Sequence, residues 1–400
     1  LDRSAAMSAP HVVDLVLGGT MPFEEPDGPD MLARALDSGR FSATTDPAVA
    51  SQAEVVVIVI GTPVDEHQNP DPDAVRRAIA EIADHLRDGQ LLVLRSTVYP
   101  GVTRLVERYI SGLGRDIEVA FCPERIAEGK AFTELYELPQ IVSGCTERAV
   151  ERASKLFSTL ASQIVEVEPE EAELAKLFTN SWRYIKFAAA NQFYMVANNY
   201  GLDYERIRDA IRFDYPRASD LPGAGFAAGP CLYKDTAQLA AFNSNNFPLG
   251  NASMLVNEGL PLYLVARLEQ RFDLSTCTVG IVGMAFKGES DDIRSSLAYK
   301  LRRILRFKAG EVLCADPYVT VDPTAEEIVE MTLLAAEEIR RFGIEPKAAL
   351  LSFSDFGSRD APSSRKMRRA GEILREIAPD LEFDGEMHAD SAMSELLRQR

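Results

Sequence analysis

The sequence has no apolar run that could cross a bilayer. Its longest aliphatic run is Val55–Ile60, whereas a transmembrane helix needs about 20 predominantly apolar residues. The first residues also lack the basic, apolar and small-residue succession of a signal peptide. We therefore expect no membrane partner.

Positive charge is scarce as well. The 400 residues include 43 Lys and Arg against 61 Asp and Glu, which gives a formal net charge of -18. Proteins that bind nucleic acid need clustered Lys and Arg to neutralise phosphates, so this balance disfavours a nucleic-acid partner. A small anionic ligand needs only local positive groups and is compatible with the sequence.

Cysteines are few and form no recognisable pattern. There is no CxxC pair and no spacing typical of metal ligands among the five, which are Cys122, Cys145, Cys231, Cys277 and Cys314. An odd number of scattered cysteines indicates free thiols, so we expect no metal site and a reducing, cytoplasmic setting.

The first 165 residues alternate between short apolar runs and helical patterns. Such runs, when uninterrupted, are typical of a parallel sheet covered on both faces. The predicted strands are Val55–Ile60, Leu91–Leu94, Ile117–Phe121 and Gln140–Ser143, and the helices between them include Asp73–Leu86 and Thr103–Ile110. We expect an α/β, Rossmann-like domain over residues 1–165 that binds its ligand at the carboxyl ends of the strands.

Three further regions follow. Residues 166–272 predict a central helical domain, with helices at Glu170–Tyr200, Tyr204–Ile211 and Ala252–Phe272 and a loop at Leu221–Pro230. Residues 273–320 predict the start of a second, incomplete α/β domain, with Thr278–Val282, Leu297–Phe307 and Val312–Ala315 as strand, helix and strand. Residues 321–400 predict a C-terminal α/β fragment, with helix Thr324–Phe342, strand Ala348–Phe353, helix Lys366–Ile377 and a short tail. We expect this fragment to pack by itself rather than complete the preceding sheet.

Two turns follow predicted strands directly. Gly61-Thr62-Pro63 comes after the first strand, and Ser96-Thr97 comes after the second. Glycine allows the backbone to approach a ligand closely, and the hydroxyls can bond phosphate or ribose. These turns are therefore candidates for a dinucleotide site, and the alternative is that they are ordinary connections.

Two pairs of polar residues are spaced four apart. Glu124 and Glu128 follow the third strand and would share one face of a helix, where paired carboxylates suit acid–base chemistry. Lys176 and Asn180 lie on the long predicted helix, where a cation and an amide can stabilise an oxyanion. The alternative for both pairs is a solvated helix surface.

The strongest local signal is the sequence Gly229 to Asp235. It places Cys231 after a flexible loop and at the start of a predicted helix, whose N-terminus would lower the pKa of the thiol. Asp235 lies one turn further on, where it can orient water or accept a proton. The alternative is a small buried hydrophobic residue.

In their order along the chain, these motifs resemble those of the UDP-glucose/GDP-mannose dehydrogenase family. The pieces are Gly61-Thr62-Pro63, Ser96-Thr97-Val98 with Pro100-Gly101, Pro123-Glu124 with Glu128-Gly129, Lys176 with Asn180, Gly225-Phe226, Cys231, Lys234-Asp235, Ala285-Phe286-Lys287 and Arg294. The residues around Glu124 and the segment Leu138–Val142 resemble the branch that acts on UDP-N-acetylhexosamines, with UDP-glucose as the alternative substrate.

The resemblance implies oxidation of a sugar C6 alcohol to the carboxylate with two NAD⁺. Cys231 would hold the sugar as a thiohemiacetal and then a thioester, Lys176 and Asn180 would stabilise the oxyanion, and Glu124, Thr97 and Asp235 would position or activate water. It also implies an NAD site made of Asp2, Gly61, Thr62, Pro63, Ser96, Thr97 and Glu128. Substrate would be held by Glu124, Arg217, Gly225, Phe226, Lys287 and Arg294. A homodimer through the central long helix is a further implication.

Two features depart from the family pattern. The sequence begins at Leu1-Asp2-Arg3 without the expected first strand and GxGxxG turn, so we expect a truncated Rossmann-like sheet. From about residue 322 the chain instead resembles part of the phosphotransacetylase-like C-terminal domain of bacterial malic enzymes. The residues that carry this resemblance are Thr324–Ile328, Phe342–Lys347, Leu351–Ser354, Phe356–Ser358 and Asp384–Met387 with Asp390.

Three functions are therefore open at this point. The first is a nucleotide-sugar dehydrogenase that uses NAD. The second is a catalytically inactive chimeric or truncated protein, and the third is an acyl-CoA-responsive regulatory module on a dehydrogenase scaffold.

Overall fold

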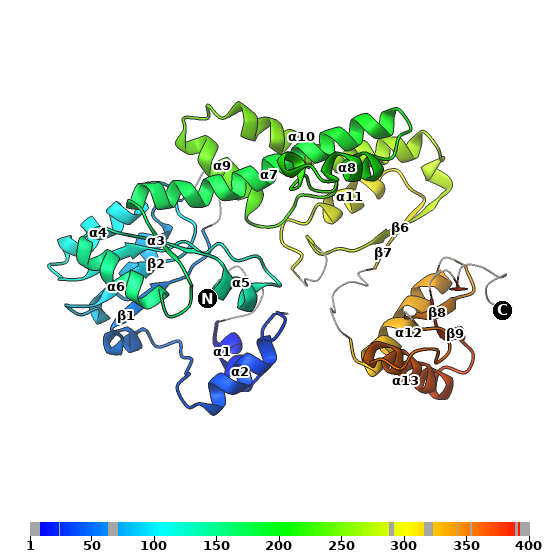
Figure 1. Cartoon of the computed structure of the whole chain (residues 1–400), viewed down its shortest axis with the longest axis horizontal. Coiled ribbons are helices and arrows are strands. Elements are labelled where there is room, and N and C mark those ends of the chain that lie inside the picture. The colour runs from blue at the N-terminus through cyan, green and yellow to red at the C-terminus, as the bar shows by residue number, and fades with distance from the viewer. Residues whose placement is uncertain are drawn as a thin grey trace. The chain divides into compact units, whose positions relative to one another are not determined.

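The computed structural model describes residues 9–23, 25–62, 71–287, 292–315, 323–341, 343–352, 354–388 and 391–392. Asp2 and Pro63, two of the expected cofactor residues, lie outside these ranges. The chain divides into two compact units, Leu1–Tyr263 with Ser290–Leu297 and Leu264–Glu289 with Ala298–Arg400. Each unit is described separately below (Figure 1).

The first unit contains a five-stranded sheet in the order β1-β2-β3-β4-β5. Its strands are β1 Val55–Ile58, β2 Leu91–Leu94, β3 Glu118–Phe121, β4 Gln140–Gly144 and β5 Ile164–Glu166. The first three run parallel, as the apolar runs predicted. β4 pairs antiparallel with β3, and β5 is parallel to β4, so the last two strands run in the opposite direction.

The reversal follows from the connection between β3 and β4. Residues 122–139 leave the carboxyl end of β3 and include only the short helix α5 (Ala131–Glu137), so the chain re-enters the sheet from that end. These residues are numerous enough for a parallel crossover, but the one helix among them, α5, buries no residue and so does not cover the face of the sheet. This connection thus stays at the edge where ligands of α/β sheets bind.

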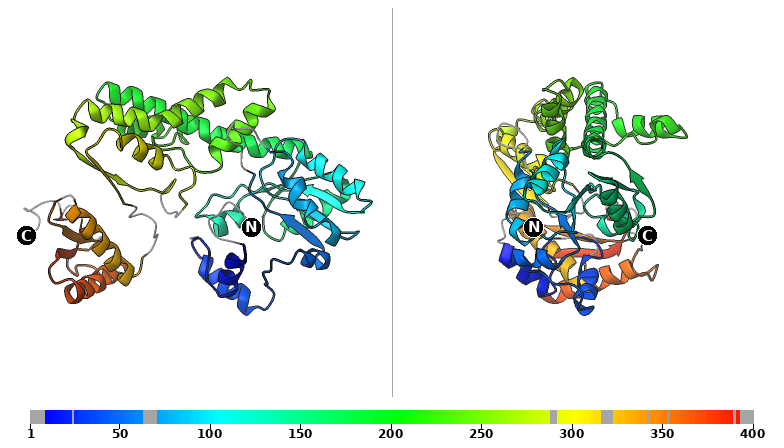
Figure 2. Two further views of the ribbon diagram at one scale, coloured as in Figure 1. Left: turned by 180° about the vertical axis from the view of Figure 1, so that it is seen from behind. Right: turned by 90° about the vertical axis from the view of Figure 1, so that its left-hand side faces the viewer.

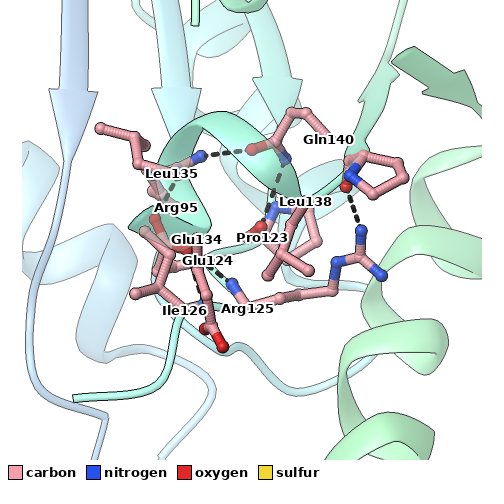
Figure 3. Close-up of a pocket in the computed structure, with 10 residues that line it drawn as sticks. Arg95, Pro123, Glu124, Arg125, Ile126, Glu134, Leu135, Leu138 and Gln140 are labelled. Atoms are coloured by element: carbon pink, nitrogen blue, oxygen red, sulfur yellow. Dashed lines mark hydrogen bonds and ion pairs between the residues drawn. The ribbon is translucent and has the colours of Figure 1, made fainter. Parts of the chain in front are cut away.

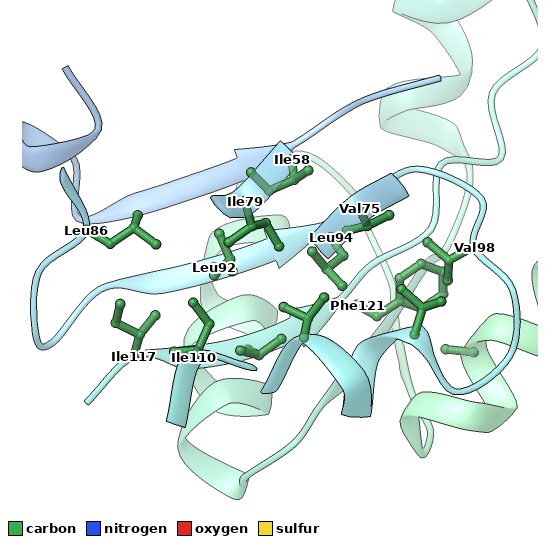
Figure 4. Packing of buried hydrophobic residues seen from close by; sticks show 14 of the residues in the cluster. Ile58, Val75, Ile79, Leu86, Leu92, Leu94, Val98, Ile110, Ile117 and Phe121 are labelled. Carbon is green, nitrogen blue, oxygen red and sulfur yellow. The ribbon is translucent and has the colours of Figure 1, made fainter. Parts of the chain in front are cut away.

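Helices cover both faces of this sheet. They are α3 Ala74–Ala80, α4 Val102–Gly112 and α6 Glu147–Phe157. Leu92 and Leu94 pack with α3 and α4 in one apolar cluster (Figure 4), whereas Leu91 and Val93 pack with α6 in another. Because alternate residues of β2 face opposite sides, all four must be apolar, and burying each contributes about 1.5–3 kcal/mol.

A long helix, α7 (Pro169–Asn199), leaves the sheet. Its start is fixed by a capping box in which the Glu168 N–H donates to Glu171 Oε2 (2.9 Å), and by a proline at the first helical position. Buried residues recur along one face of α7, where α9 packs. The other helical segments of the unit are α1 Ala9–Leu17, α2 Gly28–Asp37, η1 Pro47–Gln52, η2 Ala83–His85, α8 Tyr204–Arg212, η3 Pro216–Ala218, α9 Leu232–Phe242 and α10 Pro248–Glu269. Helix α10 belongs to this unit as far as Tyr263.

The second unit holds two separate strand pairs. β6 (Thr278–Val282) is parallel to β7 (Glu311–Ala315), and β8 (Lys347–Leu351) is parallel to β9 (Glu382–Met387). The helical segments are η4 Leu274–Thr276, α11 Leu297–Leu305, α12 Ala325–Arg341 and α13 Pro362–Ile377. Each strand pair has its own apolar cluster, and α12 and α13 pack with β8 and β9 (Figure 2).

The pairing in the second unit confirms that, among the described residues, the C-terminal fragment does not extend the β6–β7 sheet. The expected short tail is wrong in part, because it contains β9. That strand is Glu-Phe-Asp-Gly-Glu-Met, which lacks the β-branched residues that mark strands, and its pairing with β8 decides its structure.

Within the described residues, no helix is both long enough and apolar enough to span a bilayer.

Candidate active site

The two turns at the carboxyl ends of β1 and β2 are joined to each other. Thr62 Oγ1 donates to the Thr97 carbonyl (2.6 Å), and Ser96 Oγ accepts from the Ile60 N–H (2.7 Å). Gly61 is exposed, whereas Thr62 is buried. The hydroxyls thus fix the two turns side by side and leave the Gly61 backbone open to a ligand, an arrangement that fits a dinucleotide.

Cys231 is the residue immediately before α9, at the N-cap position, and its side chain makes no capping hydrogen bond. It is exposed, whereas Cys122 is buried and the other three cysteines are partly buried. Its position at the start of a helix is therefore as the sequence predicted, and it is the one exposed residue among the five cysteines.

The electrostatics of Cys231 differ from expectation. Burial among its neighbours, and then the Asp235 carboxylate, raise the pKa of the Cys231 thiol, against the opposing effects of Lys234, Lys176 and Arg294. We expected the helix N-terminus to lower that pKa. The resting group is therefore the thiol, because its ordinary pKa of 9.0 already lies above neutral pH.

Asp235 is completely buried one turn into α9 and connects three elements. Asn180 Nδ2 of α7 donates to Asp235 Oδ2 (2.5 Å), and Lys234 Nζ lies 3.3 Å from Asp235 Oδ1. Lys234 also donates to Thr62 Oγ1 (3.2 Å), at the end of β1. In the sequence Lys234 stands out only as part of the Lys234-Asp235 motif, and its position next to Asp235 is the one signal of its role.

Lys176 lies one turn before Asn180 on α7 and is partly buried. Burial lowers the pKa of its ammonium group, whereas the carboxylates of Asp235 and Glu124 oppose that change, as does the Cys231 sulfur when it is ionised. No hydrogen bond or ion pair of Lys176 is formed with the described residues. The structure thus brings Lys176, Asn180, Cys231 and Asp235 together, with an ammonium that is free to bind an incoming anion.

Glu124 is fixed by an arginine that the sequence did not single out. Its carboxylate pairs with Arg95, and its Oε1 accepts from the N–H groups of Arg125 (2.7 Å) and Ile126 (2.9 Å). Arg95 also donates to the Cys122 carbonyl (3.1 Å). These residues line a small pocket at the carboxyl edge of β2 and β3 (Figure 3).

The helix expected to carry both Glu124 and Glu128 is absent. Residues 122–130 form an irregular loop, because Glu124 bonds its own following N–H groups and Gly129 takes a positive φ of 77°. Glu128 is partly buried on this loop, and the neighbouring Gly129 N–H donates to Glu25 (2.9 Å).

The remaining substrate candidates are more scattered. Gly225 is held by Asn191 of α7, which accepts from the Gly225 N–H (2.8 Å) and donates to its carbonyl (2.9 Å), and the adjacent Phe226 is partly buried. Asn191 itself is fully buried and also donates to Asn257 of α10 (2.9 Å).

The three basic candidates have different surroundings. Arg217 is exposed and bonds the Tyr215 hydroxyl (2.8 Å), with its guanidinium over that ring. Arg294 pairs with Asp292 (2.7 Å) and is close enough to influence the Cys231 thiol. Lys287 belongs to the second unit. No cluster of three or more potential metal ligands occurs in the described part of the chain.

Comparison with known proteins defines the class. Residues 8–161 match the UDP-glucose/GDP-mannose dehydrogenase family NAD binding domain, and residues 170–258 match its central domain. Residues 292–400 match a different family, phosphate acetyl/butaryl transferase. The sheet and the turns that follow its strands are therefore those of an NAD-binding oxidoreductase.

The relatives narrow this class. The chain is 31% identical over 334 residues to UDP-N-acetyl-D-mannosamine dehydrogenase of Pyrococcus horikoshii, covering 80% of this chain and 79% of that protein. It is 31% identical over 341 residues to NDP-N-acetyl-D-galactosaminuronic acid dehydrogenase of Ralstonia nicotianae, covering 80% and 78%. This protein belongs to the UDP-glucose/GDP-mannose dehydrogenase family, and its cofactor is NAD.

Solved structures agree with this assignment. The UDP-D-ManNAc dehydrogenase of Pyrococcus horikoshii superposes with a TM-score of 0.72 at 29% identity, covering 79% of this chain and 78% of that one. A UDP-glucose dehydrogenase from Pyrobaculum islandicum gives a TM-score of 0.72 at 25% identity, covering 94% and 79%. Both the predicted family and the predicted second resemblance at the C-terminus are thus confirmed.

Proposed function

We propose that this protein is an NAD-dependent nucleotide-sugar 6-dehydrogenase that oxidises the C6 alcohol of a UDP-N-acetylhexosamine, or of UDP-glucose, to the uronate. The observation that carries the proposal is the position of Cys231, an exposed residue whose sulfur lies within electrostatic reach of Lys176 and of Asp235, the partner of Asn180. The relatives named for N-acetylated nucleotide sugars support the acetylhexosamine as the first substrate to test.

Bound NAD⁺ would accept a hydride in each of the two oxidations. The alcohol loses a hydride and a proton to become the aldehyde, and the Cys231 thiol adds to that carbonyl to give a thiohemiacetal. Loss of a second hydride and the hydroxyl proton gives a thioester, and water releases the uronate and the thiol. Covalent capture thus divides a four-electron oxidation into separate steps.

The neighbouring side chains would manage charge in these steps. The Lys176 ammonium would approach the oxyanion that forms when the thiol adds, helped by the second N–H of Asn180. The Oδ1 atom of Asp235 is buried, lies 3.3 Å from Lys234 Nζ and accepts no hydrogen bond among the described residues, so it would be able to accept one from a water molecule that reaches it. Glu124, held by Arg95, and Thr97 would position that water.

The cofactor would lie along the carboxyl ends of β1 and β2. Gly61, Thr62, Ser96 and Thr97 would hold it, together with Asp2, Pro63 and Glu128. The nucleotide sugar would contact Glu124, Arg217, Gly225, Phe226, Lys287 and Arg294.

We further propose that α7 forms a homodimer interface. Four large apolar side chains on this helix are each at least half exposed, and they are Phe178, Trp182, Phe193 and Val196. At 3.6 residues per turn they lie within about 60° of each other around the helix. Such an apolar stripe is typical of a surface that another helix covers.

The test compares the wild-type chain with Cys231→Ser and Cys277→Ser. NADH formation is followed with UDP-N-acetylhexosamine and, separately, with UDP-glucose, and mass spectrometry looks for a sugar adduct on the Cys231 peptide. We expect Cys231→Ser to form no uronate and no adduct, while Cys277→Ser retains most activity. Uronate formation by Cys231→Ser at the wild-type rate would remove the thioester mechanism, and an equal loss in both variants would assign the cysteines to folding.

A further inference from the structure

Glu173 is a buried carboxylate on α7 that none of the proposed chemistry uses. It is 1% exposed, and its two oxygens accept three hydrogen bonds. The donors are the Gly101 N–H (2.6 Å), the Thr103 N–H (2.8 Å) and the Thr103 hydroxyl (2.6 Å). A buried carboxylate is costly unless it is bonded in this way, so the contact is specific.

The donors belong to the N-terminus of α4. Gly101 precedes that helix with a positive φ of 95° and has no side chain with which to cap it. Glu173 therefore acts as the cap from a distant helix, and the positive end of the α4 dipole favours its charge. Burial raises the pKa of the Glu173 carboxyl, whereas the bonds from Thr103 and Gly101 oppose that rise.

The cap is one point in a closed circuit of contacts. From Gly101 the backbone leads back to Thr97, whose carbonyl accepts from Thr62. Thr62 accepts from Lys234, which neighbours Asp235, and Asp235 accepts from Asn180.

Asn180 returns the circuit to α7. It lies seven residues after Glu173, or about 10.5 Å along the helix axis, with Lys176 between the two. The circuit therefore joins the turns after β1 and β2 to the helices that carry Lys176 and Cys231, and on α7 it passes through Glu173 and Asn180. Arg104 of α4 also pairs with Glu168 (3.6 Å) and Glu170 (3.2 Å), but these contacts are more exposed than the buried Glu173 cap.

We propose that Glu173 is a positioning residue that holds the Ser96–Gly101 turn, and hence the cofactor, at a fixed distance from Lys176 and Cys231. This inference rests on the proposed function, in which that turn binds NAD. Glu173 touches none of the reacting groups. It acts through Gly101 and Thr103, and its loss opens the circuit while the Asn180–Asp235 contact is retained.

The first variant is Glu173→Gln, which keeps the shape but turns an amide NH₂ toward backbone donors. We expect it to raise the KM for NAD⁺ about tenfold with a smaller change in kcat, because a displacement of about 1 Å at a positioning contact can cost up to about a hundredfold. Thr103→Val, which removes one donor, should show a smaller effect in the same direction. Thr103→Ser keeps the hydroxyl and should restore wild-type behaviour.

The matched control is Thr146→Val. Thr146 caps α6 by accepting from the Ala149 N–H (3.1 Å), and it lies outside the circuit. This variant should lower the melting temperature without changing the KM for NAD⁺. Glu173→Gln and Thr103→Val should also be non-additive when combined, because both act on one contact.

A second measurement does not depend on turnover. The rate at which iodoacetamide alkylates Cys231 is measured by mass spectrometry in each variant, together with NAD⁺ affinity by calorimetry. We expect Glu173→Gln to change the alkylation rate at least about threefold and to weaken NAD⁺ binding, with Thr146→Val unchanged in both.

These measurements separate the two proposals. A wild-type chain that binds NAD⁺ but oxidises no sugar would contradict the proposed function. The NAD⁺ affinity and the alkylation rate of Cys231 would still test the role of Glu173. If Glu173→Gln loses thermal stability to the same extent as Thr146→Val and leaves KM, NAD⁺ affinity and alkylation unchanged, Glu173 is a structural cap and the inference is wrong.

Discussion

Asn180 and Asp235 lie 55 residues apart in sequence and are joined by a 2.5 Å hydrogen bond between α7 and α9. Asp235 is completely buried, and its charge is one of the causes that raise the pKa of the Cys231 thiol. The bond therefore fixes the position of a negative charge one helical turn from the proposed nucleophile.

Replacing that charge should activate the thiol. In Asp235→Asn the carboxylate no longer disfavours the thiolate, so the pKa of Cys231 falls and the pH profile of its alkylation shifts to lower pH. The rate of reaction with iodoacetamide, followed from pH 6 to about pH 10, measures this shift. Asp209→Asn, on the exposed face of α8, is the control and should leave the profile in place. A profile that stays fixed or moves upward in Asp235→Asn would contradict the assigned electrostatics.

Lys176 should lower the free energy of unfolding, because its ammonium group is partly buried at the proposed active site. Burial lowers its pKa below the ordinary value of 10.5, so between the folded-state pKa and 10.5 the unfolded chain binds more protons than the native chain. The free energy of unfolding therefore rises with pH in that window. Below the folded-state pKa, the destabilisation caused by the buried ammonium is fully present. Lys176→Met keeps the apolar stem and removes the charge, so it should raise the melting temperature at pH 7.

The advantage of Lys176→Met over wild type should shrink as the pH approaches 10.5. Differential scanning calorimetry at pH 7 and about pH 9.5 measures both differences. The exposed Lys155→Met serves as the control and should show neither effect. A Lys176→Met protein that is less stable than wild type at pH 7 would mean that the ammonium stabilises the fold.

Arg95 should matter for stability as well as for the position of Glu124. Its side chain is 11% exposed, and Arg95→Met removes the Glu124 pair together with the donors to the Cys122 carbonyl and to Gln140. Because Glu124 is partly exposed, we expect a loss of about 1–3 kcal/mol rather than the full cost of breaking a buried pair. Urea unfolding measures the loss. As a control, Arg108→Met at an exposed position of α4 should change the free energy of unfolding by less than about 0.5 kcal/mol. Equal losses in the two variants would mean that the contacts of Arg95 do not stabilise the fold.

The proposed dimer can be tested at Trp182, which is 56% exposed on α7. Trp182→Glu places a charge in the apolar stripe, so the molar mass from light scattering should fall from that of a dimer to that of a monomer. Leu113→Glu alters an exposed apolar residue that follows α4 and should leave the mass unchanged. A wild-type chain that is monomeric at every concentration would remove the proposal.

Much of the first unit was predictable because its signals are local. The run Leu91–Leu94 is apolar at every position, and both of its faces are buried. The start of α9 at Cys231 likewise follows from the glycine-rich loop before it. Local pattern does not give strand direction, so the reversal of β4 could not be predicted from Gln140–Gly144 alone.

The side chains that hold the site together were harder to find. Arg95 and Glu173 are single charged residues whose partners lie 29 and about 70 residues away, and nothing in their neighbouring sequence indicates burial. Asn180 and Asp235 were predicted as site residues from motif and spacing, but their direct bond depends on how α7 packs on α9. The sequence thus predicts the groups that would react better than the groups that position them.

The contact between Asn191 and Gly225 divides the loop before α9 into two parts. Both backbone groups of Gly225 are bonded to a fully buried side chain, so the loop is anchored six residues before Cys231. Between the anchor and the thiol lies Gly229, whose φ of 99° is strained for other residues. The segment from Gly225 to Cys231 is therefore held at its first residue by Asn191, and its path toward the thiol depends on a backbone conformation at Gly229 that favours glycine. A substitution at Asn191, which does not contact the substrate in the proposed reaction, would remove this anchor and leave the position of Cys231 less constrained.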